Sequence, residues 1–227
     1  MDDGAIWSVI VSQMPYLLTG LWIGIKLLAA LLAVGLVLGL VIALMEVYGH
    51  WSLKVLGILF ERVFRGIPAI VLLLLFYYGV GGYVELSSFA AAVLALGLRS
   101  TAYQSQIFRG AIQAVPQGQL VAARAMGMSM PRAIGEIVLP QALRHATGPW
   151  TNEFSSELKA TSLAYVIGVV ELTRQAKYII SNTQGNILLI FAVVGLLYFI
   201  VNWAGNRVLY RLEDRLAVPG FERRDAA

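Results

Sequence analysis

Two apolar stretches of the chain contain ionisable and polar side chains that could bind a small solute. Arg99, Thr101, Gln104 and Gln106 lie within residues 86–107, and a second set lies within residues 147–170. That second set comprises Asn152, Glu153, Ser156, Glu157, Lys159, Thr161 and Ser162. A charge at the centre of a membrane costs about 2.5–3.5 kcal/mol on insertion scales, so such side chains usually face protein or a water-filled cavity.

These side chains have two interpretations, and both remain open. In the first they line a path for a solute, whose amino group the carboxylates would hold and whose carboxylate Arg99 or Lys159 would hold. The candidate path comprises Arg99, Thr101, Gln104, Gln106, Asn152, Glu153, Ser156, Lys159 and Ser162. In the second the charges pair internally, for example Arg99 with Glu153, and serve helix association only. Asn152, Ser156 and Lys159 share one helical face, and the two glutamates share an adjacent face.

The composition places the whole chain in a membrane. Of its 227 residues 59% are hydrophobic and 13% charged, and none is cysteine. Apolar runs such as residues 27–45 read as transmembrane helices, because about 20 residues cross a hydrocarbon core of about 30 Å. We therefore expect an all-α membrane protein with one transmembrane domain over residues 1–227.

His50 and His145 have no metal-ligand spacing, so no metal site is expected. The net charge of +4 is no sign of nucleic-acid binding.

Hydropathy predicts four membrane spans, at residues 17–45, 66–80, 86–107 and 187–204, with a surface helix over residues 51–64. A fifth span, residues 147–170, is weakened by its charges and is decided by the positive-inside rule. Basic residues follow spans one and three and fill the C-terminal tail: Lys54, Arg62, Arg65, Arg109, Arg124, Arg132, Arg144, Arg207, Arg211, Arg215, Arg223 and Arg224. This distribution predicts an external N-terminus, a cytoplasmic C-terminus and five transmembrane helices.

Residues 117–146 form a polar, proline-bounded segment between predicted helices three and four, and we expect two short cytoplasmic helices there. Gly127 can end the first helix in a left-handed conformation. Ser129 is placed to cap the second, with Pro131 tolerated in its first turn. Pro140 then breaks or bends the chain, because proline lacks an amide donor. Alanines at 122, 123 and 125 leave a bare surface, and Met126 and Met128 add adaptable apolar contacts.

The spacing within this segment resembles the cytoplasmic loop signature of ABC importer permeases. That signature reads Glu-Ala-Ala, three residues, Gly, nine residues, Ile-x-Leu-Pro. Here it corresponds to Ala122-Ala123, Gly127 and Ile137-x-Leu139-Pro140, with Val121 in place of the leading Glu. The missing carboxylate implies one polar contact fewer to a partner.

Further motifs extend this resemblance over nearly the whole chain and narrow it to the polar amino-acid branch of the family. The segments that match are 61–68, which ends in Arg-Gly-Ile-Pro, then 102–103, 107–112, 115–119, 152–154 and 171–176. The histidine, glutamine, arginine and opine permeases fit best. Gln106 stands where many amino-acid permeases have Glu, which leaves open whether an anionic side chain is presented there.

The resemblance implies an ABC type I importer permease of the prokaryotic plasma (inner) membrane: a five-helix subunit in the lipid bilayer that pairs with itself or a close relative. Two separate ATPase subunits, which hold ATP and Mg, drive the pore, and an extracytoplasmic solute-binding protein delivers the cargo. The loop couples pore to ATPase through Gly118, Gln119, Ala122, Ala123, Arg124, Met126, Gly127, Met128, Ser129 and Pro140. The chain has no G-x-x-x-x-G-K-[ST] phosphate loop, so it is expected to be a transport permease without enzymatic activity.

The same sequence features bear on three alternatives to an amino-acid importer. An importer for an osmolyte or oligopeptide fits the Arg-Gly-Ile-Pro and Asn-Glu-Phe elements less well. An ATP-independent secondary transporter commonly has paired repeats, and none is visible here. The third alternative, a scaffold subunit that binds no cargo in a heteromeric permease, remains open.

Gly20-x-x-x-Gly24 and Gly35-x-x-x-Gly39 allow close helix packing, within one subunit or at a dimer seam.

Overall fold

The computed structural model describes residues 3–183 and 186–216, and its regular elements within these ranges are all helices. The long helices are α1 (Asp3–Tyr48), α4 (Ser88–Ala114), α7 (Leu139–Ala160) and α9 (Ile187–Leu216). The shorter α-helices are α2 (Trp51–Gly66), α3 (Ala69–Leu74), α5 (Gln117–Ala125), α6 (Met130–Ala133) and α8 (Leu172–Thr183). Two π-helical turns, η1 (Leu75–Val80) and η2 (Ile134–Val138), and the 3₁₀ helix η3 (Thr161–Ile167) complete the set.

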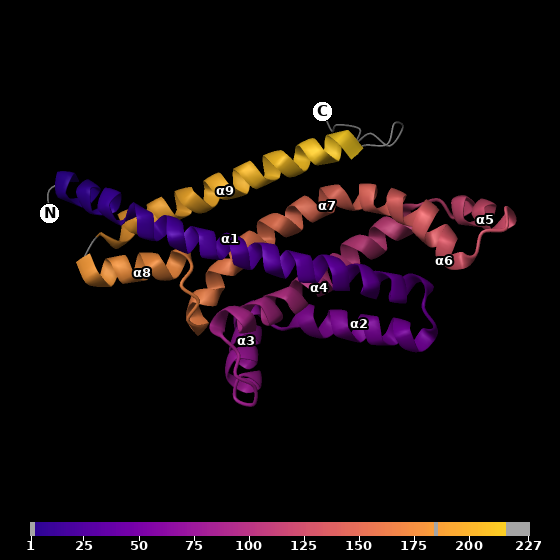
Figure 1. Cartoon of the computed structure of the whole chain (residues 1–227), viewed down its shortest axis with the longest axis horizontal. Helices are drawn as coiled ribbons and strands as arrows, with labels where there is room; N and C mark the ends of the chain where they lie inside the picture. Colours follow the sequence, from indigo (N-terminus) through magenta and orange to yellow (C-terminus); the bar gives the residue numbers. More distant parts are fainter. Residues whose placement is uncertain (1–2, 184–185, 217–227) are drawn as a thin grey trace.

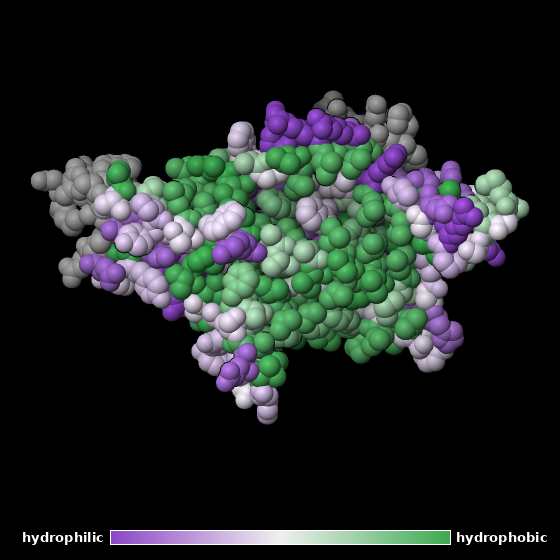
Figure 2. Space-filling model, in the orientation of Figure 1, coloured by the Kyte–Doolittle hydropathy of each residue, from purple (hydrophilic) through white to green (hydrophobic). Residues whose placement is uncertain are grey.

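The molecule is elongated, with α5 and α6 at one end and α8 at the other (Figure 1). The main core lies between them, where Leu27, Leu31, Leu73, Leu96 and Leu158 are buried together. Figure 2 shows hydrophobic residues across the middle of one face and hydrophilic residues towards the two ends. This distribution suits a protein whose middle lies in lipid and whose ends lie in water.

Close packing of α1 against α4 is made possible by glycine. A Cβ at Gly39 would lie 3.1 Å from the amide nitrogen of Ser105 and 3.2 Å from the carbonyl oxygen of Thr101. Gly20 likewise faces the backbone of Glu171. The paired glycines of α1 therefore pack within the subunit, as one of the two sequence interpretations proposed.

Among the described residues, two helices, Val11–Tyr48 and Ile187–Leu216, are long and apolar enough to cross a membrane. The bent pair of α2 and residues 69–80, with an angle of 101° between its parts, adds a third if it counts as one span. The bend follows from Pro68, which disfavours the helical conformation of the residue before it, and Ile67 is extended at ψ 130°. The separate helix predicted at residues 51–64 is confirmed as α2, and five crossings stay a prediction.

The structure both confirms and corrects the prediction for the loop. Gly127 is left-handed, at φ +88°, where the first short helix ends. Ser129 occupies the N-cap position of α6, but its hydroxyl makes no capping hydrogen bond. The chain does not break at Pro140, because the wide turn η2 leads straight into α7. A π-helical turn accommodates a proline without an amide donor, and the Gln141 side chain donates to the carbonyl of Ile137 at 2.7 Å.

The other boundaries also differ from the sequence prediction. The α-helical part of the predicted span 147–170 begins at Leu139 and passes into η3 after Ala160. Gly168, at φ +102°, then ends η3 ahead of α8. Arg223 and Arg224 of the basic tail lie outside the residues that the structure describes.

The glycine packing leads to a testable difference between two positions of α1. A methyl group at Gly35 would overlap the buried side chain of Gln104, whereas one at Gly24 meets only Thr161 Oγ1 at 4.0 Å. We expect Gly35→Ala to destabilise the purified subunit by about 1–3 kcal/mol through overpacking, and Gly24→Ala to change its stability little. Thermal unfolding followed by tryptophan fluorescence measures both, and equal effects would contradict the packing.

Candidate functional site

A cluster of polar side chains lies buried between α4 and α7. Glu157 Oε1 accepts a hydrogen bond from Arg99 Nη1 at 2.6 Å, and Glu153 Oε1 accepts one from Ser100 Oγ at 3.0 Å. Gln104 Nε2 donates to Ser100 Oγ at 3.1 Å. The cluster thus joins one guanidinium, two carboxylates, a hydroxyl and an amide.

Helical periodicity explains how these residues meet. Ser100 and Gln104 are four residues apart on α4, and Glu153 and Glu157 are four apart on α7, so each pair lies on one face of its helix. The amide of Gln104 is held from two further sides. Its Nε2 donates to the carbonyl of Leu32 at 3.3 Å, and its Oε1 accepts from Trp150 Nε1 at 2.9 Å.

The cluster contains two carboxyl groups but only one cationic side chain. The Glu157 side chain is fully buried and that of Arg99 is 17% exposed, while Arg99 also lies over the Tyr103 ring at 4.7 Å. Glu157 Oε2 has no hydrogen-bond partner. The cluster has two carboxyl groups and one guanidinium, so ionisation of both carboxyl groups would leave one buried negative charge without a partner, which is expensive.

The remaining residues of the candidate path do not join this cluster. Asn152 and Lys159 are exposed on the outer side of α7, and Ser156 and Ser162 are half-buried. Thr101 is buried, and its hydroxyl donates to the carbonyl of Gly97 in its own helix at 2.8 Å. The path predicted as one set is therefore divided into a buried cluster and an exposed stripe.

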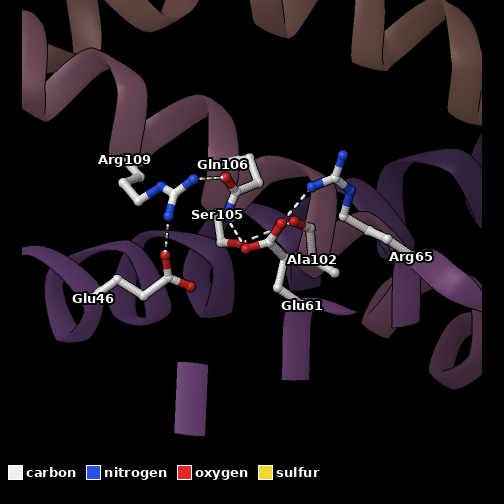
Figure 3. Close-up of polar contacts among 7 residues, drawn as sticks. All are labelled: Glu46, Glu61, Arg65, Ala102, Ser105, Gln106 and Arg109. Atoms are coloured by element: carbon white, nitrogen blue, oxygen red, sulfur yellow. Dashed lines mark hydrogen bonds and ion pairs between the residues drawn. The ribbon is translucent and has the colours of Figure 1, made fainter. Parts of the chain in front are cut away.

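Gln106 belongs to a second network, which ties α1 and α2 to α4 (Figure 3). Its side chain donates to Glu61 and accepts from Arg109. Glu61 also pairs with Arg65, and Arg109 Nη1 lies 3.2 Å from Glu46 Oε2. Sequence analysis did not find this network. The only available signals were the four-residue spacing of Glu61 and Arg65 and the three-residue spacing of Gln106 and Arg109.

The loop residues predicted to contact an ATPase are mostly at the surface. Exposed members are Gly118, Gln119, Ala122, Arg124, Met126, Gly127, Ser129 and Pro140, while Met128 is half-buried and Ala123 buried. Val121 and Met126 are 67% and 76% exposed. Arg124 Nη1 donates to the carbonyl of Met128 at 2.6 Å and so fastens the turn at Gly127. The part of the chain that the structure describes has no group of three His, Cys, Asp or Glu residues placed to hold a metal.

Comparison with known proteins identifies the class. The chain belongs to the family of binding-protein-dependent transport system inner membrane components, which matches residues 35–218. It is thus a membrane permease, as the motifs predicted.

Individual relatives match over almost the full chain. The octopine transport system permease protein of Rhizobium radiobacter is 32% identical over 222 residues, which are 93% of this chain and 89% of the relative. The glutamine transport system permease protein of Escherichia coli is 34% identical over 219 residues, 93% of this chain and 98% of the relative. A crystal structure of an amino acid ABC transporter with histidines matches with a TM-score of 0.83 and 34% identity, over 92% of this chain and 98% of that one.

The buried ion pair gives a prediction about stability. Arg99→Gln should leave Glu157 without a counter-ion and lower the free energy of unfolding by about 3–5 kcal/mol, and Glu157→Gln should do the same to Arg99. The double variant should recover part of that loss, because neither charge is then stranded. Thermal unfolding of the four proteins in detergent measures the coupling, and strictly additive losses would show that the two side chains act independently.

The second network offers a matched pair of arginines. Arg109→Gln would strand the carboxylate of Glu46, which is 2% exposed, and we expect a loss of about 2 kcal/mol, limited by the 36% exposure of Arg109 itself. Arg132→Gln breaks a pair whose side chains are 65% and 55% exposed, and should cost less than about 1 kcal/mol. Both variants are compared with the wild type by thermal unfolding, and a larger loss for Arg132→Gln would be incompatible with the network.

Proposed function

We propose that this chain is the permease subunit that forms the pore of an ATP-driven ABC importer for a polar amino acid or a related small solute. The family match and the relatives named for octopine and glutamine support this class of substrate. The observation that carries the proposal is the cluster of Arg99, Glu153 and Glu157 buried between α4 and α7. Such a cluster matches a solute with a charged amino group.

The exposed stripe of α7 supports a path rather than a purely structural role. Asn152 and Lys159 are exposed although their helix packs into the bundle, and polar side chains at membrane depth normally face protein or water. A second permease, either another copy or a close relative, would enclose this stripe next to the buried cluster. Lys159 or Arg99 would then hold the carboxylate of the solute, and Glu153 its amino group.

The proposed topology has five crossings, with the N-terminus outside and the C-terminus in the cytoplasm. Basic residues near α5 and α6, including Arg109, Arg124 and Arg144, support a cytoplasmic position for that end. The opposite end, which carries α8, then faces the solute-binding protein (Figure 1).

The loop of residues 117–146 is proposed to dock into a separate ATPase, which would hold ATP and Mg. Its exposed Val121 and Met126 provide an apolar contact, and the hydrogen bond from Arg124 to Met128 keeps the turn rigid. A rigid connection transmits a displacement of the ATPase into α4 and α7, which carry the buried cluster.

Reconstitution tests the proposal directly. The chain is co-expressed with candidate ATPase and permease partners of the source organism, purified as a complex and placed in liposomes with ATP inside. Candidate solute-binding proteins of that organism are added outside, one at a time, with radiolabelled glutamine, arginine, histidine or octopine. Uptake that requires ATP and a solute-binding protein, and that survives a protonophore, supports the importer. Uptake driven by an ion gradient without ATP would identify a secondary transporter, and unchanged uptake after Glu153→Gln and Lys159→Gln would leave this chain a scaffold.

The turn at Gly127 gives a sharper prediction for coupling. Gly127→Ala places a side chain in a left-handed conformation, at a cost of about 1–2 kcal/mol, and should shift α5 relative to α6. We expect a severalfold loss of uptake at constant ATP while the subunit still folds. Gly135→Ala is the control, because its methyl group would also meet no atom within 4 Å but the backbone is not left-handed there. Equal uptake by the two variants would exclude a role for the turn geometry.

A further inference from the structure

Helix α8 lies at the end of the molecule away from α5 and α6 (Figure 1). A surface pocket of about 450 Å³ lies between it and η3. Its lining consists of Tyr165, Val166, Arg174, Lys177, Tyr178 and Ser181. The lining therefore includes two cations and two phenol rings but no carboxylate.

Both cations are held in place by neighbouring groups. Arg174 Nη1 donates to the carbonyl of Tyr165 at 2.7 Å, and Arg174 Nε donates to the Tyr178 hydroxyl at 2.8 Å. Lys177 Nζ lies over the ring of Tyr165, 4.2 Å from its centroid. Cations fixed in this way lose little conformational entropy when an anion binds.

The two cations are not neutralised within the described part of the chain. Its ion pairs involve Arg65, Arg99, Arg109 and Arg132, and none includes Arg174 or Lys177. The neighbouring Glu171 is fully buried, and its carboxylate accepts from the backbone amides of Thr173 and Arg174 at 2.9 Å. The positive charge of the pocket is thus directed outwards.

The helix that carries the pocket is firmly anchored. Leu172, Ala176 and Ile179 on the opposite face of α8 are buried together with Leu17 of α1. Lys177 and Tyr178 lie on the exposed face of the same helix. The pocket is also adjacent to η3, which continues α7 beyond Glu153, Glu157 and Lys159, so anything bound there lies at the end of the helix that bears the polar cluster.

We propose that this pocket is a docking site for carboxylate side chains on the surface of the extracytoplasmic solute-binding protein. The inference rests on the proposed importer function and its orientation. Charge complementarity selects an acidic partner, because the lining offers two outward cations and no acceptor carboxylate. Its position, at the end opposite the loop of residues 117–146, selects the protein that delivers the solute over the ATPase.

Lys177 is the best position for a test, because it makes no hydrogen bond that shapes the pocket, whereas Arg174 also holds the carbonyl of Tyr165. The complex is assembled in nanodiscs of phosphatidylcholine, and its affinity for the solute-binding protein that supports uptake is measured by biolayer interferometry. Lys177→Glu should raise the dissociation constant about tenfold or more at low salt, Lys177→Ala should raise it less, and Lys177→Arg should leave it near the wild-type value. High salt should reduce these differences.

Several controls make the result specific. Arg211→Glu reverses an exposed charge on α9 and should leave the dissociation constant unchanged, and basal ATP hydrolysis should be the same in all variants. A hexaglutamate peptide should compete with the solute-binding protein, and hexalysine should not. Wild-type affinity in Lys177→Glu overturns the docking site. So does a Lys177→Glu effect that appears only in nanodiscs with added phosphatidylglycerol, because the pocket then binds lipid. A wild-type complex that binds no solute-binding protein overturns the importer function as well.

Discussion

The close approach of α1 to α4 is the constraint on which the rest of the structure depends. Gly35 and Gly39 remove the side chains that would separate the two helices, and the space at Gly35 is filled by the amide of Gln104. That amide in turn reaches the carbonyl of Leu32 on α1, Ser100 on its own helix and Trp150 on α7. One glycine-lined contact therefore fixes the rotation of α4, and with it the direction in which Arg99 and Ser100 meet the glutamates of α7.

Two sets of charged side chains inside this bundle link different elements. Arg99, Glu153 and Glu157 connect α4 with α7 near the middle of the chain, whereas Gln106 and Arg109 connect the next two turns of α4 with α1 and α2. Buried ion pairs add little net stability compared with apolar packing, but losing one partner is costly. The two sets consequently do more to fix the positions of the helices relative to one another than to raise the free energy of unfolding.

The sequence predicted the elements and the family better than the contacts between them. Sequence patterns located the loop, the left-handed Gly127 and the separate helix at residues 51–64, because these depend on local backbone preferences. The sequence prediction placed Gln104 and Gln106 in one path. The two glutamines lie in different networks, because side chains two residues apart on an α-helix point about 200° apart. It also suggested Glu153 as a partner of Arg99, whereas the partner is Glu157. That choice depends on the rotation of α7 against α4, which no local pattern encodes. The turn η2 was likewise missed, since proline signals a disturbed helix without saying how the chain absorbs it.

The arrangement of α7 and its extensions, η2 and η3, explains how a displacement could be transmitted between the two ends of this permease. η2 lies within the loop of residues 117–146, α7 carries Glu153 and Glu157 through the bundle, and η3 ends at Gly168 beside the cationic pocket. The helical turns are continuous from Met130 to Ile167, so a displacement at either end changes the position of the carboxylates without first bending a flexible linker. The wide turn η2 and the tight helix η3 are the places where such a rod can change its winding, because π and 3₁₀ segments often mark functional hinges. A buried polar cluster midway along this rod is accordingly placed where displacements at both ends of the rod reach it.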